Sequence, residues 1–145
     1  MSAIKEPKMG RFSVEVELAN DEDLVRAKDR SIKPAQVRRA RVRGVVDSGA
    51  TRLVIPESLA KQLGLEISGK ATVRYADGRT SNRSVAHRIH LAYGGRDSVF
   101  SAIVEPKRES VLIGAIVLEE LDFVVDCTGQ RLVPRDPKQI ISEAE

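Results

Sequence analysis

Aromatic residues are scarce in this sequence. Only 3% of the 145 residues are Phe, Tyr or Trp, and Trp is absent. A core must therefore be built mainly from Val, Ile, Leu and Ala, and few rings are available to stack on unpaired nucleic-acid bases. This scarcity argues against a protein that binds single-stranded nucleic acid.

Cysteine and histidine are almost as rare. Cys127 is the one cysteine, so no disulfide can form within the chain, and no histidine lies near it in the sequence. No Cys and His residues have zinc-site spacing, and no glycine-rich phosphate loop is present. His87 and His90 are expected at the surface or an interface. We expect no metal, no cofactor and no thiol nucleophile, and a reduced, cytoplasmic compartment.

Long hydrophobic runs are also missing. No apolar stretch approaches membrane-spanning length, and residues 1–12 lack the apolar centre of a signal peptide. Hydrophobic residues make up 41% of the chain and charged residues 31%, which is typical of a soluble globular domain. We therefore expect one domain with a sizeable core and no membrane partner.

The basic character of the chain is mild and has a structural explanation. The net charge is +3, and arginines at 39, 41 and 43 alternate with apolar residues. Segments 12–18 and 37–46 both show the period-2 pattern of a half-buried strand. If they pair antiparallel, the acidic face of the first lies beside the arginine face of the second. Nucleic-acid binding is therefore the disfavoured alternative.

Many short strands are predicted along the rest of the chain. Asp77-Gly78 indicates a two-residue primed hairpin turn, since Asp-Gly tolerates positive φ. Further strands are predicted at 53–55, 71–76, 80–91, 99–104, 111–113, 123–125 and 130–133, and short helices at 57–63 and 115–122. The fold class is therefore mostly β with one or two short helices. Closure into a barrel would leave few unpaired strand edges.

No repeat, low-complexity segment or linker divides the sequence. We expect an N-terminal lead-in at 1–10 and a single domain at 11–134. A polar stretch at 20–36 is interpreted as a surface insertion within a hairpin. The C-terminal tail at 135–145 is expected to reach over the surface or to another subunit.

The stretch Val45-Val46-Asp47-Ser48-Gly49-Ala50-Thr51 places a lone carboxylate at the end of an apolar strand. The small residues after Asp47 suit a tight turn whose backbone amides can face a carboxylate. From these residues alone, an ordinary Asp-Ser-Gly turn is the alternative. Asp126 also ends an apolar strand, but the Asp-Cys-Thr-Gly sequence there lacks the same spacing, and we interpret it as a turn residue.

The order of elements around Asp47 carries more information than the turn alone. The turn is followed by an apolar strand, a helix that begins after Pro56, a glycine-tipped hairpin and, much later, Leu112-Ile113-Gly114 with a short helix. This order resembles the retropepsin-like aspartic proteases, a single-lobed family of retroviruses and many bacteria. The matching pieces span most of residues 12–133. The resemblance implies a closed acid-protease barrel with one lobe per chain.

Two departures make the sequence more similar to the bacterial single-domain members than to the viral enzymes. Viral retropepsins usually carry an acid where this chain has Thr51 and an arginine where it has Ala115. Those two family residues form an ion pair beside the active site. Both charges are missing together here, so no orphaned charge is left buried.

The resemblance implies an aspartic endopeptidase that hydrolyses internal bonds of a peptide or protein substrate without a cofactor. The family's reaction uses two carboxylates that share a proton and activate a water. The chain has one such triplet, so Asp47 would be catalytic beside Asp47 of a second copy in a symmetric homodimer. The alternative is a catalytically inactive retropepsin-fold module for dimerisation or peptide binding.

The resemblance also assigns supporting roles. In the active-site turn, which includes Ala50 and Thr51, Ser48 would donate its hydroxyl across the dimer axis, and Gly49 would admit substrate backbone where a Cβ would obstruct it. Ala76-Asp77-Gly78-Arg79 would form the tip of a flap that excludes water, and Leu112-Ile113-Gly114 would form a supporting loop. A turn residue, a plain hairpin and ordinary core packing are the respective alternatives.

Overall fold

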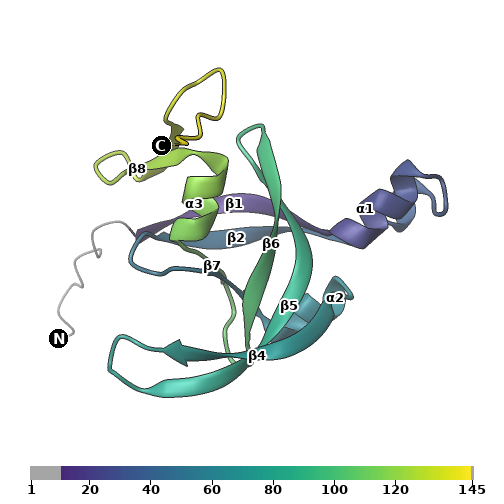
Figure 1. The fold of residues 1–145 in the computed structure, drawn as a ribbon, viewed down its shortest axis with the longest axis horizontal. Coiled ribbons are helices and arrows are strands. Elements are labelled where there is room, and N and C mark those ends of the chain that lie inside the picture. Colours follow the sequence, from purple (N-terminus) through teal and green to yellow (C-terminus); the bar gives the residue numbers. More distant parts are fainter. Residues whose placement is uncertain (1–10, 145) are drawn as a thin grey trace, which may run out of the picture.

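A closed six-stranded β-barrel forms the body of this computed structural model, which describes residues 11–144 (Figure 1). The predicted lead-in at 1–10 and the last residue of the predicted tail lie outside the described residues. The elements in chain order are β1 (Arg11–Asn20), α1 (Asp21–Lys28), η1 (Pro34–Gln36), β2 (Arg39–Asp47), β3 (Leu53–Pro56), α2 (Glu57–Gln62), β4 (Glu66–Arg74), β5 (Thr80–Tyr93), β6 (Arg96–Glu105), β7 (Val111–Ile113), α3 (Ala115–Leu121), β8 (Phe123–Asp126) and β9 (Arg131–Pro134).

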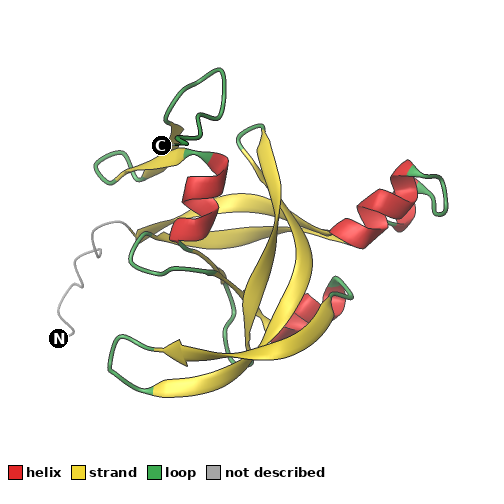
Figure 2. Cartoon of the chain, viewed as in Figure 1, coloured by secondary structure: helices red, strands yellow, loops and turns green. Residues whose placement is uncertain are grey.

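The barrel closes because its first strand pairs at both edges. The strand order is β1-β2-β7-β3-β6-β5, and β1 also pairs with β5, so the ring has no open edge. β4 lies outside the ring and pairs with β5 alone among the described strands. The mostly β, single-lobed fold is confirmed (Figure 2), although the described residues form three short α-helices rather than one or two.

The alternation predicted for the first two strands is confirmed. β1 and β2 pair antiparallel, with Glu15 opposite Arg43 and Glu17 opposite Arg41. The Arg41 guanidinium lies 3.5 Å from the Glu15 carboxylate and 4.0 Å from that of Glu17. These pairs are exposed and each contributes little stability, but they disfavour a shifted register.

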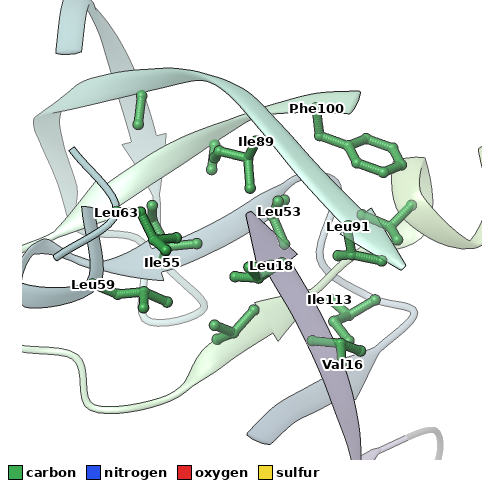
Figure 3. Packing of buried hydrophobic residues seen from close by; sticks show 14 of the residues in the cluster. Val16, Leu18, Leu53, Ile55, Leu59, Leu63, Ile89, Leu91, Phe100 and Ile113 are labelled. Carbon is green, nitrogen blue, oxygen red and sulfur yellow. The ribbon is translucent and has the colours of Figure 1, made fainter. Parts of the chain in front are cut away.

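The core is aliphatic, as the composition predicts. Every strand of the ring contributes buried side chains, and α2 and α3 cover the ends of the cluster (Figure 3). The largest fully buried side chains are Leu18, Leu53, Ile55, Leu63, Ile89, Leu91, Ile113 and Leu121. In α3, the buried side chains are Val117, Leu118 and Leu121.

The turn of the β4–β5 hairpin differs from the prediction. A two-residue primed turn at Asp77-Gly78 is wrong: only Gly78 has positive φ (+88°), and five residues separate the paired Arg74 and Thr80. The Asp77 carboxylate instead accepts the Arg79 backbone N–H at 3.0 Å, which stabilises a wider loop. The primed geometry occurs at Gly94-Gly95, where both residues have positive φ.

β4 begins at Glu66, five residues before the predicted start. The alternation pattern does not predict this first part of β4, because a bulge between Ile67 and Lys70 interrupts its pairing with β5. Gly69, at φ +83°, lies in this irregularity and breaks the apolar-polar alternation. The longer strand makes the β4–β5 hairpin a large arm, visible at the bottom of Figure 1.

Segments that were predicted as peripheral contain buried polar groups. Residues 20–36 hold α1 and η1, and α1 extends away from the barrel (Figure 1), yet Asn20 and Asp23 are buried. The tail after β9 contacts its own chain, where Arg135 pairs with Asp122 at 2.8 Å. No helix formed by residues 11–144 has the length and apolar character that crossing a membrane requires.

Candidate active site

Asp47 lies at the carboxyl end of β2, beside the parallel strand β7. Val45 and Val46 pair with Leu112 and Ile113, so the strand that carries Asp47 is anchored in the barrel wall. The side chain of Asp47 is 24% exposed. Its Oδ1 accepts the backbone N–H of Gly49 at 3.0 Å, and its carbonyl oxygen accepts that of Ala50 at 3.1 Å. A backbone amide therefore faces the carboxylate, as the small residues of the turn predict.

The loop after β7 holds the other side of this turn. Ala115 donates its N–H to the Ala50 carbonyl at 2.8 Å, and Ile116 donates to the Thr51 carbonyl at 2.9 Å. A Cβ on Gly114 would lie 2.4 Å from the Arg52 carbonyl oxygen, so only glycine permits this approach. The two loops are therefore joined through their backbones.

Arg11 is the charged neighbour of Asp47. The two residues are opposite each other across the β1–β2 ladder, and Arg11 Nε lies 3.2 Å from Asp47 Oδ2. The Nε atom is buried but makes no hydrogen bond to a described residue, because the angle to the carboxylate is poor. Attraction without an aligned hydrogen bond leaves Asp47 available for other partners.

Asp47 opens into a cleft of about 1410 Å³ between the barrel and the β4–β5 hairpin. Its lining residues are Arg11, Asp47, Gly49, Ala50, Thr51, Arg52, Val54, Ala71, Thr72, Val73, Arg74, Tyr75, Ala76, Arg79, Arg83, Ile103, Glu105, Pro106, Lys107, Arg108 and Leu112. The β2–β3 loop and the tip of the hairpin face the same side of the barrel, opposite α1 (Figure 1).

The structure brings together part of each segment named from the sequence. From the Asp47 turn, Gly49, Ala50 and Thr51 line the cleft, while Ser48 is exposed outside it. From the hairpin tip, Ala76 and Arg79 line the cleft, whereas Asp77 and Gly78 do not. From the supporting loop, Leu112 reaches the cleft, whereas Ile113-Gly114 are buried behind the turn.

A polar network beside the tip of the hairpin has no counterpart in the sequence prediction. The Tyr75 hydroxyl donates to Glu105 at 2.6 Å and accepts from Arg83 Nε at 3.0 Å. Arg83 also lies 2.9 Å from the Glu105 carboxylate. No local sequence pattern shows that Glu105 faces these two residues. The network ties the hairpin to the end of β6.

Arg108 is a half-buried cation that lines the cleft. Burial is the main cause that lowers the pKa of its guanidinium, and the neighbouring Arg11 lowers it further, while Glu105 and Asp47 act in the opposite sense. Its Nε donates to the Ser110 carbonyl at 2.6 Å. The site therefore holds a cation that lacks full compensation by nearby carboxylates.

The residues set aside in the sequence lie outside this cleft. His87 contacts Ser101 Oγ at 3.0 Å, and His90 lies 2.7 Å from Asp97. Cys127 is exposed in the β8–β9 turn. Among residues 11–144, no group of three or more His, Cys, Asp or Glu side chains gathers as a metal site would require.

Comparisons with known proteins agree with this arrangement. A family model described as "gag-polyprotein putative aspartyl protease" matches residues 33–120, which is more than half of the chain. None of the curated proteins matches the sequence. Among solved structures, the EIAV protease complexed with the inhibitor HBY-793 superposes with a TM-score of 0.53 at 14% identity, over 90% of this chain and 99% of that one. At that identity the superposition shows the fold, and the family model shows the membership. The chain belongs to the retropepsin-like, retroviral-type aspartyl protease family.

Proposed function

We propose that this chain is an aspartic endopeptidase in which Asp47 is catalytic. The observation that carries the proposal is the position of Asp47. It ends a barrel strand on the family's turn and faces a cleft whose lining includes Ala76 and Arg79 of the hairpin tip. Gly49 leaves space beside it, and the hairpin would act as a flap that excludes water from bound peptide.

The reaction requires a second carboxylate, because two acids must share one proton. We propose a homodimer in which Asp47 of each copy faces the other, with Ser48 linking the two turns across the axis. One carboxylate removes a proton from water while the other protonates the peptide carbonyl oxygen. The resulting diol collapses as a proton passes to the amide nitrogen, so the C–N bond breaks. Leu112-Ile113-Gly114 would support the turn from behind.

The proposal extends to the domain bounds, the kinship and the compartment of the chain. We place the catalytic domain at 11–134, with 20–36 as an insertion and 135–145 as a tail. Thr51 and Ala115, in place of the viral ion pair, favour kinship with the bacterial single-domain members. The exposed thiol of Cys127 suits a reduced, cytoplasmic compartment.

The decisive experiment replaces Asp47 with Asn and measures cleavage of a peptide library together with oligomeric state. Activity should fall by at least about 1,000-fold, because the substitution removes the carboxylate that each subunit contributes to the catalytic pair. The matched control is Asp126→Asn, which changes the rival acid at the end of β8 and should retain activity. Unchanged cleavage by Asp47→Asn would overturn the assignment, as would a wild type that stays monomeric while active.

One observation favours an inactive peptide-binding or dimerisation module as the second candidate. Arg11 lies 3.2 Å from Asp47 within the same chain, so a second copy would meet a carboxylate that already has a cationic neighbour. Under this candidate the wild type dimerises and binds peptide but cleaves none. The library experiment separates the two, since binding and cleavage are measured on the same protein.

A further inference from the structure

The positive charge of this chain is concentrated in the cleft. Seven of the lining residues are cationic, and Asp47 and Glu105 are the lining carboxylates. The whole sequence has a net charge of only +3, so the rest of the chain is slightly acidic. The cationic lining residues are Arg11, Arg52, Arg74, Arg79, Arg83, Lys107 and Arg108. A cleft lined by one sign of charge concentrates ligands of the opposite sign.

Several of these cations lack an acidic partner in the described part of the chain. Arg79 pairs with Asp77, Arg83 with Glu105 and Arg11 with Asp47. No ion pair among residues 11–144 involves Arg74 or Lys107. Both residues line the cleft, one on β4 and the other after β6. A bound ligand would therefore meet unpaired positive charge from two separate segments of the chain.

Two further observations point to a negatively charged ligand. Arg108 is partly buried, and burial together with Arg11 lowers the pKa of its guanidinium. Arg11 Nε is buried without a hydrogen bond to any described residue. Both residues line the same cleft. A carboxylate that entered here would compensate the positive charge of these two guanidinium groups.

The shape of the cleft favours an extended peptide over a nucleic acid. β4 is an edge strand, and consecutive residues 71–76 line the cleft, which presents the backbone edge of the strand rather than one side-chain face. Such an edge can form a ladder with an added strand. Tyr75 is the one aromatic residue of the lining, so the cleft offers a single ring on which a nucleic-acid base could stack.

We infer that the cleft selects acidic peptides, with Asp or Glu side chains of the bound segment meeting Arg74, Lys107 and the Arg11–Arg108 pair. This inference rests on the proposed function and names its substrate class. No ion pair of the described residues joins Arg74 or Lys107 to Asp47, so these two cations govern which peptide binds rather than how the bond is cleaved. Selectivity should therefore appear mainly in KM and should weaken as salt is added.

The test compares two peptide libraries that differ only in Asp and Glu versus Asn and Gln. Wild type should cleave the acidic library with a kcat/KM at least about 10-fold higher at low salt, and the ratio should shrink near 0.5 M salt. Arg74→Glu with Lys107→Glu should abolish the preference while neutral peptides are still cleaved. Arg39→Glu makes the same kind of charge change on the exposed outer face of β2 and should keep the preference.

Binding to the Asp47→Asn protein separates failure of this inference from failure of the proposed function. Fluorescence anisotropy with one acidic peptide, its neutral counterpart and a single-stranded oligonucleotide measures selectivity without cleavage. Tighter binding of the acidic peptide supports the inference even if wild type cleaves nothing. Equal cleavage and equal binding of the two peptides would overturn it and leave the protease assignment intact. Oligonucleotide binding tighter than peptide binding, and sensitive to Arg74→Glu, would also overturn it.

Discussion

Asp23 and Asp47 are both Asp residues that face an arginine, yet their surroundings differ sharply. Asp23, in α1, is 5% exposed in its side chain, and Arg38 donates to it from its backbone N–H at 3.0 Å and from Nε and a terminal nitrogen at 2.8 and 3.0 Å. Asp47 is 24% exposed and has an arginine nearby without an aligned hydrogen bond. The hydrogen bonds from Arg38 lower the pKa of Asp23 despite its burial.

The difference shows how a structural carboxylate is distinguished from an available one. The carboxylate of Asp23 is occupied by hydrogen bonds from Arg38. Asn20, which accepts the Asp23 backbone N–H, continues the network by donating to the Leu63 carbonyl at 2.9 Å. This network joins the segment 20–36 to the end of α2. Asp47 instead keeps one side open to a cleft. Occupied acceptors stabilise the fold, whereas unoccupied ones can accept a ligand or a proton.

The largest expected effect on stability comes from Asp23→Ala. The substitution leaves a backbone N–H of Arg38 without its acceptor and removes a buried charge pair, so the free energy of unfolding should fall by about 3 kcal/mol. Urea denaturation measures the loss. Asp47→Asn serves as the contrast and should change stability by less than about 1 kcal/mol. A larger loss for Asp47→Asn than for Asp23→Ala would erase the distinction.

Removing the arginines instead of the acids sharpens the comparison. Arg38→Gln should cost about 2 kcal/mol, since Asp23 stays buried with a weaker set of donors. Arg11→Gln should cost less than about 1 kcal/mol, because its pair is partly exposed and poorly aligned. Thermal unfolding of both variants measures these costs. Peptide turnover should change only for Arg11→Gln, and a change in turnover per folded molecule for Arg38→Gln would contradict this.

The hydrogen-bonded carboxylate of Asp23 also predicts a pH dependence. Because the pKa of Asp23 is lower in the folded protein than its ordinary value of 3.8, the unfolded chain binds the proton first as pH falls. The stabilisation is complete above about pH 5 and is lost progressively below about pH 4. The stability gap between wild type and Asp23→Ala should therefore narrow in acid. A gap that is the same at pH 3 and pH 7 would contradict the assigned cause.

The smallest expected effect concerns the flap. Tyr75→Phe removes the hydroxyl that bridges Glu105 and Arg83, but the direct pair between those two residues remains. Stability should fall by about 1 kcal/mol or less, and KM for peptides should change by no more than about 5-fold. Tyr93→Phe is the matched control, since the Tyr93 ring packs on Phe123 away from the cleft. Equal effects in both variants would show that the bridge has no role in the flap.

Much of the barrel could be predicted because strands leave a local signature. Alternation at 12–18 and 37–46 identified both the buried face and the charged face of β1 and β2. The same reasoning missed the first half of β4, because a bulge at Gly69 interrupts the alternation. It also assigned the primed turn to Asp77-Gly78 rather than to Gly94-Gly95, since turn type depends on how the flanking strands pair.

Local sequence was sufficient for the mostly β class, the aliphatic core and the Asp47 turn, because periodicity and small residues act over a few neighbouring positions. The tertiary structure alone decided which residues surround that turn. Arg11, Arg74 and the adjacent Lys107 and Arg108 come from three separate parts of the chain, yet barrel closure and the β4–β5 hairpin bring them to one cleft. Electrostatic attraction acts through space, so a charge pattern made by folding has no counterpart along the sequence.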